Sequence, residues 1–412
     1  MSLERHAGNG HQTVDVSFSE GKGELASCGI IREYWNKLTT PTLGQLSLLL
    51  GLCLLIGLGM GIAIDVNEFS MHAFYRNRLV RCYLRAIRKK DADPKPNPNP
   101  VSDLDPGDDP HLADLADPSI DQKKGLPYLG PYLLINTALN LTDPRRLGWQ
   151  ERQAAPFILA PLYCGSNITG YRKTREYADN ITLGTALAIS GAAFTSNMGY
   201  HTNRALAFFL SIFNVRLGWW IGHPGREGYT RQGPRLGLPY LLVELFGRAN
   251  EERRYIYLSD GGHFDNLGIY ELIRRRCKYI VCSDAGEDPQ SGFDDLGMVI
   301  RKVRADLGVD IEINLDMVRR QQDQPYSRWH HAIGTIRYDL VDESSPVGML
   351  VYIKASLVGD EPADVLEYKA HHADFPHETT LDQFFSESQF EAYRKLGEPI
   401  GREVFRYAQQ AL

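Results

Sequence analysis

The segment that most restricts the fold of this chain runs from Tyr255 to Asp284 and reads YIYLSDGGHFDNLGIYELIRRRCKYIVCSD. Its first four residues are aromatic or branched, which predicts a buried strand. Asp260 then precedes two glycines, and paired glycines permit a positive φ or the close approach of another backbone segment. The apolar residues that follow predict a helix, and a second buried strand, Tyr279 to Cys282, leads to Asp284.

Two parallel strands joined by this helix would form a βαβ unit with a right-handed crossover. Asp260 and Asp284 would then both lie at the carboxyl ends of strands, where open α/β sheets place their active sites. An aspartate before a glycine pair is also common in turns and at the start of helices. These residues alone therefore leave a catalytic and a purely structural role open for Asp260.

Composition narrows the class of protein. The chain has 412 residues, 43% of them apolar, which predicts one large globular domain with appendages. The net charge of -6 gives no indication of a nucleic-acid footprint, so we predict no nucleic-acid partner. The six cysteines show no CxxC spacing, and the histidine pairs 330–331 and 371–372 do not suit two ligands on one face. We therefore predict no metal and no cofactor.

An uncharged run of 22 residues, 43–64, contrasts with the rest of the chain. About 20 apolar residues span a bilayer, so we predict a transmembrane helix there, the alternative being a buried helix of a large core. Arginines and lysines gather between Arg76 and Lys90, after the run, and the positive-inside rule places that side in the cytoplasm. The prediction is a single-pass membrane protein in contact with membrane lipid, with its C-terminal domain on the cytoplasmic side.

The parts around this run differ in composition. Residues 1–42 predict a loose polar tail. Residues 65–90 form a basic amphipathic juxtamembrane segment, which either lies along the membrane surface or is an ordinary surface helix. Residues 91–125 hold nine aspartates and seven prolines and predict an acidic linker that buries no core. Within 126–412 we predict a helix that Asp294 or Asp295 caps and Gly308 ends, and a hairpin of 334–341 with 349–357.

The segment YLSDGGHFDNLGIYELIRRRCKYIV resembles the Asp-Gly-Gly block of patatin-like phospholipases, especially their large membrane-associated branch. The runs AISGAAFTSNMGYH, residues 188–201, and FPHETTLDQFF, residues 375–385, are also similar to that branch, so the resemblance covers roughly residues 65–400. It implies an α/β fold in which 126–412 is part of a patatin-like (cytosolic phospholipase A2-like) sheet flanked by helices, and the transmembrane helix predicted above precedes this part. It also implies a lipid acyl hydrolase with a Ser-Asp dyad, in which Asp260 is the catalytic acid and base.

Further residues near Asp260 are candidates for supporting roles. Gly261 and Gly262 would form the supporting turn. His263 is expected to be only a solvated or hydrogen-bonded group of that loop. The candidates for supporting Asp260 from nearby are Asp265, Asn266 and Asp284.

The family's nucleophile is the serine of a G-x-S-x-G turn, and its oxyanion donors come from a glycine-rich turn with an arginine. Neither motif occurs in this chain, and no serine has glycine at both the -2 and +2 positions. Ser190 lies in AISGA, Ser166 in CGSNI and Ser259 in YLSDG. We therefore identify no nucleophile.

Residues 1–42 are too few and too polar to hold a strand, an elbow and a helix. The chain thus resembles the C-terminal part of such an enzyme: a truncated product, a subunit completed by a second chain or N-terminal half that carries the nucleophile, or a degenerate member. The predicted activity is carboxylic-ester hydrolysis of the phospholipase type. The alternative is a catalytically inactive membrane-anchored interaction or lipid-binding module of the same fold.

Overall fold

The structure is a computed structural model that describes residues 42–63, 65–68, 70–85, 97–100, 103–116, 131–145, 147–193, 216–320, 326–379, 382 and 385–411. The predicted polar tail up to residue 41 lies outside the described residues, as do 86–96, 101–102 and 117–125 of the predicted basic segment and linker. Residues 194–201 of the AISGAAFTSNMGYH run also lie outside them. The chain divides into two units, 1–63 and 64–412, and each is described by itself.

In the first unit, helix α2 spans Leu43–Ala63. The structure describes its side chains as far as Gly59, and its leucines are exposed. No helix within the described ranges combines the length and the apolar character needed to cross a membrane. The transmembrane helix over 43–64 therefore stays a prediction.

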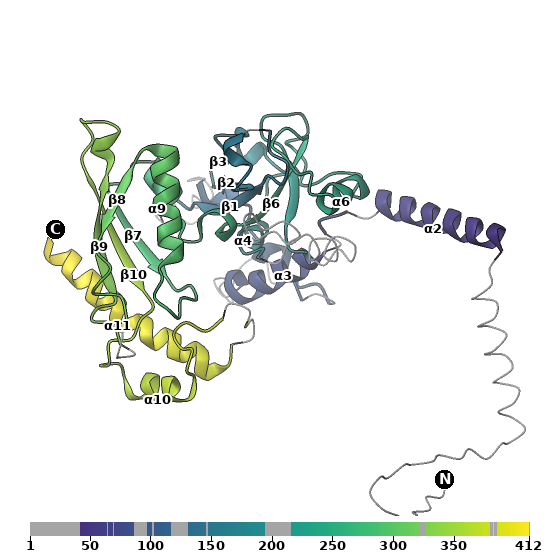
Figure 1. The fold of residues 1–412 in the computed structure, drawn as a ribbon. Coiled ribbons are helices and arrows are strands. Elements are labelled where there is room, and N and C mark those ends of the chain that lie inside the picture. Colours follow the sequence, from purple (N-terminus) through teal and green to yellow (C-terminus); the bar gives the residue numbers. More distant parts are fainter. Residues whose placement is uncertain are drawn as a thin grey trace, which may run out of the picture. The chain divides into compact units, whose positions relative to one another are not determined.

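The second unit holds two β-sheets with helices, which is a mixed α/β architecture (Figure 1). The larger sheet has the order β4-β3-β2-β1-β6-β5, and every neighbouring pair in it is antiparallel. Its strands are β1 Ile135–Asn140, β2 Ala154–Leu159, β3 Tyr163–Ser166, β4 Gly170–Lys173, β5 Trp219–Gly222 and β6 Tyr255–Asp260.

The smaller sheet has the order β7-β10-β9-β8. Its strands are β7 Tyr279–Asp284, β8 Asp310–Ile313, β9 His331–Arg337 and β10 Gly348–Lys354. Strands β9 and β10 form the predicted hairpin, with Gly348 opposite Ile336. Strand β7 runs parallel to β10, which places Asp284 opposite Lys354.

Helices fill the space beside and between these sheets. They are α3 Met71–Leu79, a π-helical turn Val80–Leu84, α4 Leu183–Ser190, α6 Leu238–Leu245, α7 Gly262–Asp265, α8 Tyr270–Arg274, α9 Asp294–Leu307, α10 Ala363–His371 and α11 Glu387–Ala411. Short 3-10 turns span Pro106–Asp108, Leu112–Ala116, Leu147–Trp149, Thr174–Glu176 and Tyr338–Leu340.

One hydrophobic core joins the two sheets through α7, α8 and α9. It combines Ala138 of β1 with Phe264 of α7, Val299 of α9 and Tyr352 of β10, all of them buried. A second core lies between the larger sheet and α4, where Leu258 of β6 meets the buried side chains of that helix. The apolar side chains of the segment between β6 and β7, such as Phe264 and Ile273, are therefore held in the first of these cores.

The structure contradicts the parallel βαβ unit predicted for 255–284. Strand β6 pairs with β1 on one edge and with β5 on the other, so neither edge is open to β7, which belongs to the smaller sheet. The single predicted helix is also two short ones, because Gly268 between them adopts a φ of 68°, which a continuing α-helix does not allow. Asp260 and Asp284 still end their strands, but in different sheets.

Helix α9 confirms the predicted end at Gly308, whose φ of 68° makes it a left-handed C-cap. The predicted aspartate cap at its start is wrong. The residue before the helix is Phe293, also left-handed, and neither Asp294 nor Asp295 caps from outside; both lie in the first turn. There their charges favour the positive end of the helix dipole.

The segment from Asp65 to residue 85 is part of the domain. Val66 is buried in a cluster with Trp220 and Tyr257, and His72 is fully buried against Trp219. Helix α3 packs against α4. The described part of this segment thus has a buried face, as a surface helix of a globular domain has.

The described part of the predicted acidic linker also packs against the domain, which corrects the expectation that it buries no core. Leu112 is fully buried in the core beside α4. The carboxylate of Asp109 accepts the backbone N–H of Gly184 at 2.6 Å, in the first turn of that helix. Composition did not reveal this, because Asp105 and Asp109 accept backbone N–H groups and are not solvated charges.

Candidate functional site

Asp260 is the last residue of β6, at the point where the chain turns into α7. Its Oδ1 accepts the backbone N–H of Gly262 at 2.7 Å. Burial raises the pKa of Asp260 to about 6, although the hydrogen bond from Gly262 acts in the opposite direction. The carboxyl group therefore titrates close to neutral pH, where a general base is most effective.

The turn requires glycine at both positions because there is no space for a Cβ, and not because the backbone has an unusual φ. Gly261 has a φ of -56°, but a Cβ on it would lie 2.6 Å from the backbone oxygen of Asn136 in β1. A Cβ on Gly262 would lie 2.7 Å from Oδ1 of Asn266 and 3.0 Å from Oδ1 of Asp260. Of the two uses predicted for the glycine pair, close approach is the one that the structure has.

We expect Gly261→Ala to lower the free energy of unfolding by about 1–3 kcal/mol, because the new methyl group must displace the backbone of β1. The unfolding midpoint in urea, followed by circular dichroism, measures this. Gly397→Ala is the matched control, since nothing lies within 4 Å of its Cβ position in α11. Equal midpoints for the two variants would show that the close approach at Gly261 carries no constraint.

Ser190 lies beside this turn, but its hydroxyl group is not hydrogen-bonded to Asp260. Its backbone oxygen accepts the N–H of Gly261 at 3.1 Å, and its Oγ donates to the backbone oxygen of Asn136 at 2.7 Å. Ser190 is also the last residue of α4, where the helix dipole is negative and disfavours an oxyanion. The position therefore joins α4 to the turn and does not prepare the hydroxyl for attack.

The other two serines considered above are also engaged. The Oγ of Ser166 accepts the N–H groups of Ile168 and Thr169 in a tight turn. Ser259 is fully buried and precedes Asp260, so the two side chains point to opposite faces of β6. Within the described ranges, no serine hydroxyl is hydrogen-bonded to Asp260.

Sequence reasoning missed a contact between Ser259 and His263. The Oγ of Ser259 lies 2.8 Å from Nδ1 of His263, and Nδ2 of Asn140 donates to the same Oγ at 2.8 Å. The i, i+4 spacing could have suggested the pair, but the asparagine comes from a distant strand.

The three supporting candidates lie in different places. Asn266 is exposed beside Gly262 and donates to Oδ2 of Asp295 at 2.6 Å. Asp265 is buried and accepts the N–H of Tyr270 at 2.7 Å, so it closes the turn between α7 and α8. Burial raises the pKa of Asp265, although its hydrogen bonds from backbone N–H groups and the charge of Lys302 act in the opposite direction.

Asp284 belongs to a separate buried network in the smaller sheet. Its Oδ1 lies 3.0 Å from Nζ of Lys354, and its Oδ2 accepts the hydroxyl of Tyr352 at 2.5 Å. The same Nζ donates to the backbone oxygen of Gly286 at 3.1 Å. The structure therefore gives Asp284 a role in holding β7 to β10.

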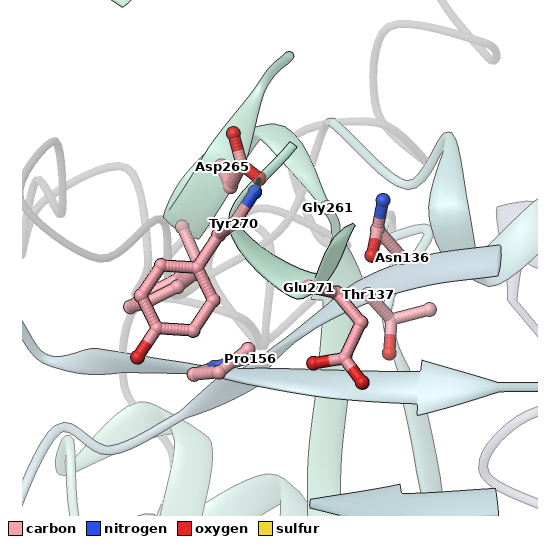
Figure 2. A pocket seen from close by; sticks show the side chains of 8 residues that line it. Asn136, Thr137, Pro156, Gly261, Asp265, Tyr270 and Glu271 are labelled. Carbon is pink, nitrogen blue, oxygen red and sulfur yellow. Dashed lines mark hydrogen bonds between the residues drawn. The ribbon is translucent and has the colours of Figure 1, made fainter. Parts of the chain in front are cut away.

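Figure 2 shows the small cavity beneath the Asp-Gly-Gly turn. Asn136 and Thr137 of β1 and Pro156 of β2 face residues of 261–271 across it. Its volume is about 10 Å³, which is room for roughly one water molecule. This cavity cannot hold an acyl chain.

A possible ligand set that the sequence did not suggest lies in the smaller sheet's half. His330, Asp360 and Glu361 each place one ligand atom within 4.8 Å of the others. Both carboxylate oxygens of Glu361, however, accept backbone N–H groups, from Val358 and Gly359. These bonds fold the loop before α10 and account for the position of the glutamate without an ion.

Comparisons of this chain with protein-family models, with curated proteins and with solved structures return no match. The candidate site is therefore characterised by its geometry alone. It offers a half-buried carboxylate that titrates near neutral pH, at a turn that requires glycine, without a serine partner in the described part of the chain.

Proposed function

We propose that this chain provides the aspartate half of the Ser-Asp dyad of a patatin-like lipid acyl hydrolase, with Asp260 as the base. The observation that carries the proposal is the pKa of Asp260, which burial raises to about 6 at the Asp-Gly-Gly turn. A carboxylate with this pKa can take a proton from a serine hydroxyl and return it near neutral pH.

The chemistry proceeds in two steps. The serine Oγ attacks the ester carbonyl carbon of an acyl lipid while Asp260 takes the hydroxyl proton, and the C–O bond to the alcohol then breaks as the alcohol receives that proton. Water attacks the acyl-serine ester, again with Asp260 as base, and releases the fatty acid. The serine and the oxyanion donors come from a second chain or an N-terminal half that carries the G-x-S-x-G and glycine-rich turns.

Membrane attachment is part of the proposal. It is supported by the absence of charge in 43–64, by the exposed leucines of α2 and by the basic residues that follow. The helix would cross the bilayer once, with the second unit on the cytoplasmic side.

A second candidate function is a non-catalytic membrane-anchored module of the same architecture that binds lipid or another protein. Two observations favour it. No described serine hydroxyl is hydrogen-bonded to Asp260, and the cavity under the turn holds only about one water molecule.

A labelling experiment separates the two. The tagged full chain would be purified in detergent, together with its bound partners, from membranes of the cell that encodes it, and treated with a fluorophosphonate probe. Wild type would be compared with Asp260→Asn and with Asp316→Asn, the matched control at an exposed aspartate.

The proposal expects a labelled serine on a companion polypeptide or N-terminal half, with labelling lost in Asp260→Asn and retained in Asp316→Asn. Labelling of the 412-residue chain itself that depends on Asp260 would move the nucleophile into this chain, and Ser190→Ala would be the next variant. The absence of any labelled protein, or labelling that survives Asp260→Asn, would overturn the dyad and leave the non-catalytic module.

A further inference from the structure

Helix α6 is apolar on both sides. Its inner side packs Tyr240, Leu241 and Val243 against Trp220 and Tyr257. Its outer side exposes a stripe, defined here as Leu236, Leu238, Leu242 and Phe246, each 39% to 66% exposed. The last three repeat every four residues and therefore share one face of the helix. A helix with two apolar faces is normally covered on both.

A cationic hollow adjoins one end of this stripe. It is an open depression of about 540 Å³, lined by Phe246 together with Arg145, Arg248 and Arg253, and one carboxylate, Asp143. Arg145 lies 3.8 Å from Glu252, with both side chains more than half exposed, which is a weak surface pair. No described carboxylate pairs with Arg248 or Arg253. The hollow therefore keeps an excess of positive charge beside an exposed phenylalanine.

Leucine and phenylalanine next to arginine is the composition of a surface that lies in the membrane interface, with the apolar side chains among the acyl chains and the cations at the phosphates. We propose that the stripe and the cationic hollow form a docking surface for the anionic face of a phospholipid bilayer. The inference rests on the proposed membrane attachment and adds which face of the domain meets the lipid and which headgroup charge it selects.

Chain continuity supports this occupant. Val66 follows the end of the α2 helix by three positions in the sequence, and it is buried against the start of α6: a Cβ on Gly237 would lie 2.9 Å from Cβ of Val66. The segment that follows the proposed membrane span in the sequence is thus packed against the first residues of α6, the helix that carries the stripe. The cytoplasmic leaflet, on which the second unit is proposed to lie, is the leaflet that carries anionic lipids.

The test reads the environment of the stripe in the full chain. Phe246→Cys would be labelled with the environment-sensitive fluorophore NBD after Cys28, Cys53, Cys82 and Cys277 are replaced by serine. The chain would be reconstituted in vesicles of phosphatidylcholine, with and without phosphatidylglycerol. Leu340→Cys, an exposed position at the end of the 3-10 turn after β9, is the matched control for the label. Flotation of the vesicles reports membrane attachment independently of the label.

We expect the label at 246 to shift to the blue and brighten on vesicles with phosphatidylglycerol, less so without it, and to reverse with added salt. The label at 340 should stay in water. Each of Arg145→Gln, Arg248→Gln and Arg253→Gln should weaken docking roughly five-fold, as removing one cation near an anionic surface does. Arg402→Gln, on the exposed side of α11, should leave docking unchanged.

A chain that floats while the label at 246 stays in water would overturn this inference and leave the membrane attachment standing. A chain that does not float would count against both. A blue shift that grows with protein concentration in the absence of vesicles would assign the stripe to a second copy of the chain and overturn the lipid docking.

Discussion

Replacing Lys354 by methionine should lower the free energy of unfolding by about 3–5 kcal/mol, because it leaves the buried carboxylate of Asp284 without a counter-charge. Both side chains of this pair are at most 5% exposed, so water cannot replace the lost ammonium group. The second acceptor oxygen of Asp284 already binds Tyr352 and offers no compensation. Urea unfolding of the full chain in detergent measures the loss.

Two comparisons give this result its meaning. The double variant Asp284→Asn with Lys354→Met removes both charges and should be more stable than Lys354→Met alone. Arg402→Met breaks an ion pair whose arginine is 79% exposed and should cost less than about 1 kcal/mol. If Lys354→Met cost no more than Arg402→Met, the buried pair would contribute nothing to the fold.

Replacing Asp260 by asparagine should stabilise the protein at neutral pH by about 1–3 kcal/mol. The folded-state pKa of about 6 lies above the ordinary value of 3.8, so the folded protein holds this proton more tightly than the unfolded chain. The stabilisation that comes from protonated Asp260 in the folded protein is therefore fully present below pH 3.8 and is lost as the pH rises through 6. The amide carries no charge and avoids that loss, while its oxygen can still accept the N–H of Gly262.

The difference between Asp260→Asn and wild type should consequently be absent near pH 3.8, grow up to pH 6 and stay constant above it. Thermal unfolding across this pH range measures the difference. Glu343→Gln, an exposed carboxylate in the turn between β9 and β10, should change the profile little. A difference that is the same at all pH values would mean that burial does not perturb Asp260.

Local pattern was sufficient for elements whose partners are close in sequence. The aromatic and branched run at Tyr255, the helix stop at Gly308 and the β9-β10 hairpin all depend on neighbouring residues, and the structure has them. The partners of β6 could not be predicted in this way. They come from Ile135–Asn140 and Trp219–Gly222, and no spacing within 255–284 indicates that these strands occupy both of its edges.

The same limit applies to the candidate site. The position of Asp260 at a strand end followed from sequence, and so did the need for glycine after it. That Asp284 would face Lys354 could not be predicted, because the lysine enters through the parallel pairing of β7 with β10. Burial sets the pKa of Asp260, and the elements that pack against its strand β6, such as β1 and α4, lie far away in the chain.

The two hydrogen bonds between Asn67 and Trp220 have a consequence for how the protein avoids self-association. The Asn67 side chain donates to the Trp220 carbonyl oxygen at 2.8 Å and accepts the Trp220 N–H at 2.9 Å. Strand β5 is the edge of the larger sheet, and an edge strand offers free peptide groups to any extended chain it meets. A side-chain amide thus imitates the peptide of a neighbouring strand and closes that edge, so the segment after α2 also protects the sheet from pairing with other chains.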